Sequence, residues 1–429
     1  MSLPSTDHVT PYDRAAWSAA AVRRALESAR HAEELRGYFG AAEYRVLRSL
    51  ARRARAAPEP AALRVIIVPG IMGSQLGLRR APPLPHDVLW LDPIDILHGR
   101  LASLALPGSA AIVPLGVVLY SYLRLQLQLR ARGFAAEFHD YDWRLPVSEL
   151  GLALARRLAQ AAPAPVALVA HSMGGLVVRA ALTAGQMRHV KRVVLLGTPN
   201  SGSFAAVQAL RGTYAVVRKL ARLVDGVSAE ELTADVFSSF PSLYDLLPHG
   251  VLAARIDLFE PGSWPTGGPQ PRAQLLAAAR AARASLAEAD GRFTTIAGVG
   301  QETVTALARR GRDFRYTLTR HGDGTVPTVS ALLPGAQALF AGVAHSELTR
   351  DARVAAAVAD LLGSGRTRRL PQSWRSASRA RVSVSDAALR RSHAGKVDWA
   401  HLSAAQRRDF LEQLNEPPHL RLRVPARRR

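Results

Sequence analysis

The chain has 429 residues, with 56 Lys or Arg against 34 Asp or Glu, which gives a formal net charge of +22. It contains no cysteine, so disulfides, thiolate metal sites and a catalytic thiol are excluded. The hydrophobic fraction of 48% is ordinary for a globular protein, and one large domain with extensions accounts for the length.

The first segment, residues 1–58, is rich in Ala, Arg and Glu and is predicted to be a helical N-terminal extension. Its apolar positions, among them Trp17, Ala21 and Leu26, are expected to pack on the core. No stretch here combines a basic start with an uninterrupted apolar segment, so no signal peptide is expected.

A single large domain is predicted over residues 59–364, because apolar runs with strand character alternate with helical patterns. This alternation predicts an α/β fold with a mainly parallel central sheet flanked by helices. A further strand is expected to end in Tyr141–Arg144. The five clearest strands are expected at Val65–Val68, Val166–Ala170, Val193–Leu196, Thr294–Ala297 and Ala338–Phe340.

Two segments inside this domain are expected to be special. The longest uncharged run, Leu101–Tyr122, is interrupted by Pro107 and Pro114, so it predicts a loop followed by a helix over Val117–Arg130, not a membrane-spanning helix. The segment from about residue 203 to about residue 290 has a mixed helical pattern. This pattern predicts a helical cap insertion, with helices over Phe204–Leu223 and Ala229–Leu247.

The C-terminal segment, residues 365–429, is predicted to be a basic, partly disordered tail. Residues 366–429 hold 16 Lys or Arg and five Asp or Glu, an excess of 11 and half of the net charge. Arg366–Arg381 is expected to be a linker, Trp399–Leu414 helical, and Pro417 onward disordered. This excess of positive charge is expected either to bind an anionic membrane surface or, equally, to belong to a solvated tail that has no partner. Nucleic acid is not the expected partner.

The most informative motif is Ala170–Gly175 (Ala-His-Ser-Met-Gly-Gly), which joins the predicted strand to an apolar helical stretch. A strand that turns sharply into a helix at a serine exposes the hydroxyl on a strained elbow, and small residues two before and two after it are sterically required. Ser172 is therefore the candidate nucleophile.

Two partners follow in the chain order that this chemistry needs. Asp323, in His-Gly-Asp-Gly-Thr-Val-Pro, is the candidate acid, and His345, just after the last predicted strand, is the candidate base. His321 is a rival histidine, but it lies two residues before Asp323. A tetrahedral oxyanion also needs backbone donors, for which Met173 and Ile71 are the candidates.

Five segments carry a shared pattern: Pro69–Leu76, Tyr141–Arg144, Ala170–Gly175, Phe240–Tyr244 and Gly322–Pro327. Together they resemble the lecithin:cholesterol acyltransferase family of α/β-hydrolases. The resemblance implies the α/β-hydrolase fold and an acyl-serine intermediate formed from a lipid ester. It also implies a mouth or lid position for Trp90, for which the alternative is a buried tryptophan on a loop. Ala170 stands where glycine is commoner in that family, and the disulfides of its secreted animal members are missing.

These patterns predict a serine acyl hydrolase or O-acyltransferase that acts on lipid esters, such as phospholipids, with Ser172, Asp323 and His345 as its triad. One alternative is a carboxylesterase for short soluble or polymeric esters. Another is a basic protein that binds membrane or nucleic acid and keeps a vestigial hydrolase core. No metal, cofactor or obligate protein partner is expected. The expected location is the cytoplasm or the periphery of a membrane.

Overall fold

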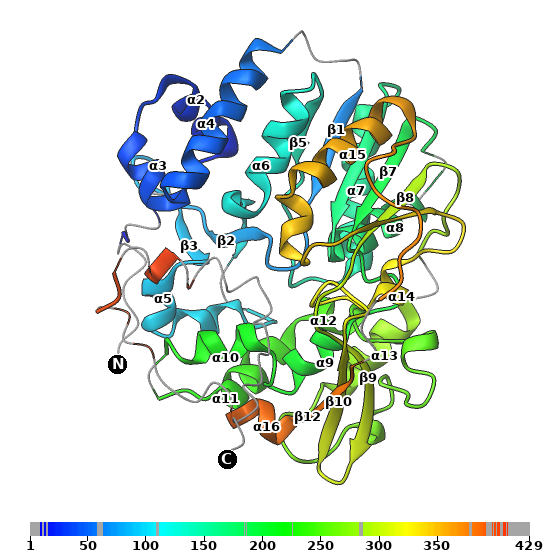
Figure 1. The fold of residues 1–429 in the computed structure, drawn as a ribbon. Helices are drawn as coiled ribbons and strands as arrows, with labels where there is room; N and C mark the ends of the chain where they lie inside the picture. Colours follow the sequence, from blue (N-terminus) through cyan, green and yellow to red (C-terminus); the bar gives the residue numbers. More distant parts are fainter. Residues whose placement is uncertain are drawn as a thin grey trace, which may run out of the picture.

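The central feature of the protein is a six-stranded parallel sheet with the strand order β11-β8-β7-β6-β1-β5 (Figure 1). The computed structural model describes residues 9–10, 13, 16–57, 63–108, 111–183, 185, 187–224, 226–282, 286–376, 380–391, 397, 399, 401–403, 406–408 and 410. The strands are β1 (Arg64–Val68), β5 (Ala135–Phe138), β6 (Val166–His171), β7 (Val190–Leu196), β8 (Phe293–Gly298) and β11 (Gln337–Ala341). The five clearest predicted strands are confirmed.

The strand expected near Tyr141–Arg144 is β5, which ends earlier than predicted, at Phe138. It is an edge strand with the sequence Ala-Ala-Glu-Phe and is mostly half-buried. Because it lacks β-branched residues and a fully apolar run, its pattern is weaker than that of the central strands.

Both faces of the sheet are buried, since successive residues of each strand point to opposite sides. On one face Val65 and Ile67 belong to the core that includes α6 (Leu119–Arg130) and α15 (Ala352–Ser364). On the other face Ile66 and Val68 belong to the core that includes α7 (Val147–Ala161) and α8 (Met173–Thr183). The predicted architecture, a parallel sheet flanked by helices, is therefore confirmed.

The N-terminal helices cover one side of this sandwich, at the blue end of the colour scale in Figure 1. They are α2 (Ala19–Ser28), α3 (Ala32–Phe39) and α4 (Ala41–Ala56). Leu26 and Leu47 are fully buried and share a core with Leu123 of α6. The expectation that this apolar stripe packs on the core is confirmed.

The helices between β7 and β8 are shorter than the sequence pattern indicated. The chain turns at Gly212, which has a φ of +65°, and a new helix starts at Pro241, so neither predicted helix is continuous. The observed elements are α9 (Phe204–Leu210), α10 (Ala215–Ala221), α11 (Ala229–Asp235), η2 (Phe237–Ser239), α12 (Pro241–Asp245), η3 (Gly250–Leu252), η4 (Pro261–Ser263) and α13 (Ala273–Ala282). Helices α9 to α12 lie together below the sheet in Figure 1.

Two small antiparallel sheets complete the fold, and sequence reasoning named neither. The first has the order β3-β2-β4 and includes β4 (Val113–Val117), which occupies the end of the uncharged run before α6. The second has the order β12-β10-β9. The remaining elements are β2 (Ser74–Leu78), β3 (Asp87–Trp90), α5 (Pro93–Leu97), η1 (Arg100–Leu104), β9 (Thr303–Arg310), β10 (Asp313–Thr319), α14 (Thr328–Ala331) and η6 (Ser346–Thr349).

Part of the predicted tail belongs to the folded body. Strand β12 (Val382–Ser385) pairs with β10, and α16 (Asp386–Arg391) follows it directly. Pro417 onward and most of Trp399–Leu414 lie outside the described residues. The division into extension, hydrolase domain and tail stays a prediction. Within the described ranges, no helix is both long enough and apolar enough to cross a membrane.

Candidate active site

Ser172 lies at the turn between β6 and α8, and its φ of +55° is rare for a residue with a side chain. The turn is possible because its neighbours are glycines: a Cβ on Gly174 would lie 2.3 Å from the carbonyl oxygen of Pro69. A Cβ on Gly175 would lie 2.0 Å from Oγ1 of Thr198. The small residues of the motif thus let α8 pack closely against the ends of β1 and β7, as a nucleophile elbow requires.

The three residues of the predicted triad meet at this elbow. His345 Nε2 is 2.9 Å from Ser172 Oγ, and His345 Nδ1 is 2.7 Å from Asp323 Oδ2. All three side chains are buried or nearly so, with Asp323 at 0% exposure. In this arrangement the imidazole can take the serine proton while the carboxylate fixes its orientation.

Asp323 is held in place by its own loop. Its second oxygen, Oδ1, accepts the backbone N–H groups of Thr325 at 2.9 Å and Val326 at 2.7 Å. The backbone carbonyl of Asp323 accepts the N–H of His345, which ties the acid loop to the base loop. His321, the rival of His345 for the role of the site histidine, is exposed and does not line the pocket. Its ring lies edge-on to the Trp374 ring, with 5.7 Å between the two ring centroids.

The two predicted oxyanion donors come from the turn after β1 and from the start of α8. Met173 is the first residue of α8, so its amide has no intrahelical acceptor. Ile71 lines the pocket within the turn after β1, where the Gly73 amide donates to the Gly70 carbonyl at 3.1 Å. Residue Met72 of this turn has a φ of +61°.

Trp90 is not at the mouth of the site, so that interpretation is wrong. It is 1% exposed, packs edge-on against Trp143 and donates its indole N–H to the carbonyl of Met72 at 3.0 Å. An indole with one satisfied N–H and an apolar body is suited to such a core position. From this core position, Trp90 therefore supports the turn that carries Ile71.

The Tyr141–Arg144 stretch braces the same turn. The Tyr141 hydroxyl donates to the Pro69 carbonyl at 2.5 Å, and the Trp143 indole donates to the Ser74 carbonyl at 3.0 Å. Arg144 and Asp142 form a local ion pair, with Nη2 and Oδ2 2.6 Å apart. These contacts give the stretch a structural role in shaping the site.

Sequence reasoning missed a hydrogen-bonded pair beside the triad, Tyr122 and His171. The Tyr122 hydroxyl accepts the Gly70 N–H at 2.9 Å and lies 3.0 Å from Nδ1 of His171. His171 Nε2 is 3.1 Å from the His345 carbonyl oxygen. His171 was visible inside the elbow motif, whereas nothing local marked Tyr122, which is 49 positions away from it.

The electrostatics of this pair favour one tautomer. Burial, followed by the charge of the neighbouring His345 ring, lowers the pKa of His171 well below its ordinary value. A neutral ring that donates from Nε2 to a carbonyl must accept at Nδ1, so the Tyr122 hydroxyl donates to it. Burial also raises the pKa of Tyr122 far above its usual range, which keeps that hydroxyl protonated.

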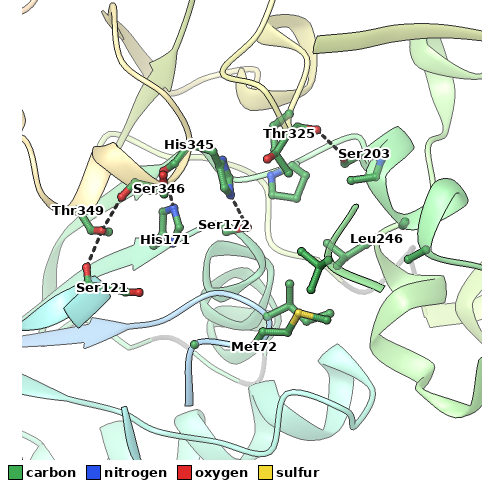
Figure 2. A pocket seen from close by; sticks show the side chains of 18 of the residues that line it. Met72, Ser121, His171, Ser172, Ser203, Leu246, Thr325, His345, Ser346 and Thr349 are labelled. Atoms are coloured by element: carbon green, nitrogen blue, oxygen red, sulfur yellow. Dashed lines mark hydrogen bonds between the residues drawn. The ribbon is translucent and has the colours of Figure 1, made fainter. Parts of the chain in front are cut away.

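A pocket opens at Ser172 and has two chemically different ends. Figure 2 shows Ser121, Ser346 and Thr349 on one side of Ser172 and Leu246 on the other. Ser203 and Thr325 lie on the same side as Leu246. Six apolar lining residues come from the helices after β7 and the residue that follows α12, and they make this end mainly apolar: Ala205, Ala206, Ala209, Val216, Leu243 and Leu246. Those residues could not be assigned from the sequence, because each apolar helix face could equally pack on the core.

Among the residues that the structure describes, no group of three or more His, Asp or Glu side chains is placed to hold a metal ion.

The sequence is similar to one family model over residues 152–231, that of a PGAP1-like alpha/beta domain, and this region includes Ser172. No curated protein matches the chain.

Among solved structures, the mature form of the Bacillus licheniformis lipase BlEst2 is 18% identical; the match covers 68% of this chain and 89% of that one, with a TM-score of 0.35. A chain of the Tle4-Tli4 complex is 16% identical; the match covers 71% of this chain and 98% of that one, with a TM-score of 0.42.

The chain has an α/β-hydrolase fold, as predicted: a parallel sheet flanked by helices carries the elbow, and the matching family model describes an α/β domain. The resemblance to the lecithin:cholesterol acyltransferase family stays a prediction, since the matching model describes a PGAP1-like domain.

Proposed function

We propose that the chain is a serine acyl hydrolase, or an O-acyltransferase, that acts on lipid esters through an acyl-Ser172 intermediate. The observation that carries the proposal is the continuous contact from Ser172 Oγ to His345 to Asp323, at 2.9 and 2.7 Å, with Ser172 and His345 lining a pocket. These are hydrogen-bonding distances for a nucleophile, its base and the orienting acid.

The proposed chemistry has two half-reactions. Ser172 Oγ attacks the acyl carbon while its proton passes to His345 Nε2, and the amides of Ile71 and Met173 stabilise the oxyanion. The intermediate collapses as His345 returns the proton to the departing alkoxide, which leaves as an alcohol. Water or a second alcohol then attacks the acyl-serine and gives its proton to His345. The bond between the acyl carbon and Ser172 Oγ breaks, His345 returns the proton to Ser172 Oγ, and an acid or a new ester is released.

A lipid substrate is supported by the apolar end of the pocket. Six apolar side chains from α9, α10, α12 and the residue after α12 line it, which suits an acyl chain better than a polar group. A carboxylesterase for short esters is the competing function within the same chemistry. It predicts little gain in rate as the acyl chain lengthens.

Hydrolysis of a series of 4-nitrophenyl esters from acetate to decanoate would test the chemistry, with the wild type compared with Ser172→Ala and Asp323→Asn. Ser172→Ala should abolish turnover, and Asp323→Asn should lower kcat by roughly 10³- to 10⁴-fold, because the base loses its orienting anion. Ser330→Ala provides a control, since Ser330 is buried outside the pocket.

A second assay would identify the substrate and the acceptor. Phosphatidylglycerol vesicles with added alcohol should yield fatty acid, or an alkyl ester if the enzyme transfers acyl groups. Turnover that persists in Ser172→Ala would overturn the triad. A serine-dependent rate that is highest for acetate, without release of acid from vesicles, would favour the short-ester carboxylesterase.

A further inference from the structure

The pocket is polar at the end that faces away from the apolar cap helices. Five of its lining residues there come from two short segments, the start of α6 and the η6 turn after His345, namely Tyr120, Ser121, Ser346, Thr349 and Arg350. The Thr349 hydroxyl donates to the Ser121 carbonyl at 2.8 Å, which joins the two segments (Figure 2). If the acyl chain occupies the apolar end, this polar end faces the alcohol part of the ester.

Arg350 is the charged group at that end. Its side chain is only 20% exposed, and its Nε–H is buried without an acceptor among the described residues. Its ion pair is with Glu347, at 3.5 Å, whose own side chain is 41% exposed. Because water screens the exposed Glu347 carboxylate, this long pair contributes little, and most of the hydrogen-bonding capacity of the guanidinium is available to another anion.

Two other carboxylates of this part of the chain, Asp351 and Asp323, have partners of their own. Asp351 follows Arg350 in the chain, but its Oδ1 accepts the N–H groups of Arg353 and Val354 at the start of α15. Asp323 is bonded to His345 and to its own loop. Within the described part of the chain, the Arg350 guanidinium therefore keeps an Nε–H donor that a bound oxyanion could fill.

We propose that Arg350 binds an oxyanion on the alcohol portion of the substrate, a phosphate or a carboxylate, and so makes the enzyme selective for anionic esters. This inference rests on the proposed acyl-transfer function of Ser172. A guanidinium recognises both anions through the same paired N–H donors, and it lies on a turn that begins at the catalytic base. The ester would then be fixed by its acyl chain at one end and by its charge at the other.

The test uses soluble, monomeric ester pairs, so that binding to a membrane surface plays no part. One pair is 1-butanoylglycerol 3-phosphate and 1-butanoylglycerol, and the other is 3-(butanoyloxy)propanoate and propyl butanoate. Values of kcat/KM would be measured for the wild type, Arg350→Met, Arg350→Lys and the control Arg353→Met. Arg353 is exposed, donates to the Arg369 carbonyl and does not line the pocket.

Arg350→Met should lower kcat/KM for an anionic ester by roughly 10- to 100-fold, the effect of losing a charge-assisted hydrogen bond, and change the neutral partner by less than about threefold. Arg350→Lys should recover part of the loss, and Arg353→Met should behave as the wild type. The two pairs show whether phosphate, carboxylate or both are selected. Equal effects of Arg350→Met on charged and neutral esters would overturn the proposal.

A binding assay separates this proposal from the function on which it rests. Glycerol 3-phosphate would be titrated into Ser172→Ala and into Ser172→Ala with Arg350→Met by calorimetry. Binding that requires Arg350, without hydrolysis of any ester by the wild type, would overturn the proposed function and leave the anion site standing. Hydrolysis of both neutral esters, with no Arg350-dependent binding or selectivity, would overturn the anion site alone.

Discussion

His171 donates its Nε2–H to the backbone carbonyl of His345, with 3.1 Å between nitrogen and oxygen. The residue before the nucleophile thereby holds the loop of the base. Through Tyr122 the same ring is connected to the amide of Gly70, at the start of the turn that carries Ile71. One buried, neutral imidazole links three parts of the site that are far apart in the chain.

Replacing His171 with Phe should therefore impair catalysis more than binding. The ring volume is kept, but the contacts to His345 and Tyr122 are lost, so we expect kcat to fall roughly 10- to 100-fold with KM changed less than about threefold. His171→Gln, which keeps an N–H donor on a side chain of similar reach, should retain more activity. Steady-state kinetics at 25 °C and the melting temperature would be measured together.

The outcome that contradicts this role is a lower melting temperature without a change in kcat. In that case His171 would stabilise the fold only, and the position of the base would not depend on it.

Gly174→Ala tests the steric argument for the elbow. An added Cβ would lie 2.3 Å from the Pro69 carbonyl oxygen and 2.6 Å from that of Val68, both backbone atoms that cannot move aside easily. We expect a loss of unfolding free energy of about 1–3 kcal/mol, measured by urea denaturation. Gly37→Ala in α3 is the matched control, because nothing lies within 4 Å of its Cβ position and alanine favours helix.

Equal stabilities of the two glycine variants would show that the elbow tolerates a side chain at residue 174. The close approach of α8 to β1 would then need another explanation.

Asp386→Ala tests whether the C-terminal segment is part of the core. Asp386 and Arg211 are both 0% exposed and 3.1 Å apart, and Asp386 also accepts the Tyr316 hydroxyl at 2.7 Å. Removing the carboxylate leaves a buried guanidinium without its counter-ion, so we expect the unfolding free energy to fall by about 3–5 kcal/mol. Asp290→Ala, which breaks a solvent-exposed pair with Arg292, should cost at most about 1 kcal/mol.

A comparable loss in both variants would mean that α16 contributes little to stability. The expected result also bears on truncation, because deleting residues 365–429 would remove Asp386 along with the basic tail.

The buried carboxylates near Trp90 predict a dependence of stability on pH. Asp95 contacts Arg100, but burial and, secondly, the Asp92 carboxylate raise the pKa of Asp95 to about 7 from an ordinary value of 3.8. A raised pKa means that the folded state holds this proton more tightly. The resulting stabilisation is complete below about pH 4 and is lost as the pH rises through about 7.

Asp95→Asn removes this titration. The melting temperature of the wild type minus that of Asp95→Asn should therefore be larger at pH 5 than at pH 8, as measured by differential scanning calorimetry. A difference that is the same at both pH values would show that Asp95 does not titrate in this window.

The sequence by itself determined those features that depend on local pattern and chain order. Buried parallel strands are continuous apolar runs, and a serine elbow needs small residues at fixed positions, so β6 and Ser172 were predictable. Asp323 and His345 followed because the fold imposes the order nucleophile, acid, base. In the folded chain, His345 Nδ1 and Asp323 Oδ2 are 2.7 Å apart, a distance that suits the base and acid of one triad.

Only the tertiary structure decided what depends on contacts between distant segments. Trp90 has the same local sequence whether it lies at a pocket mouth or under the Met72 turn, and packing against Trp143 places it in the core. Likewise, Arg350 and Asp386 are two of many charged residues in an Arg-rich chain until folding places one in the pocket and the other against Arg211. Local propensity acts over a few residues, whereas burial and hydrogen-bond partners are set by segments that lie far apart in the chain, 175 positions in the case of Arg211 and Asp386.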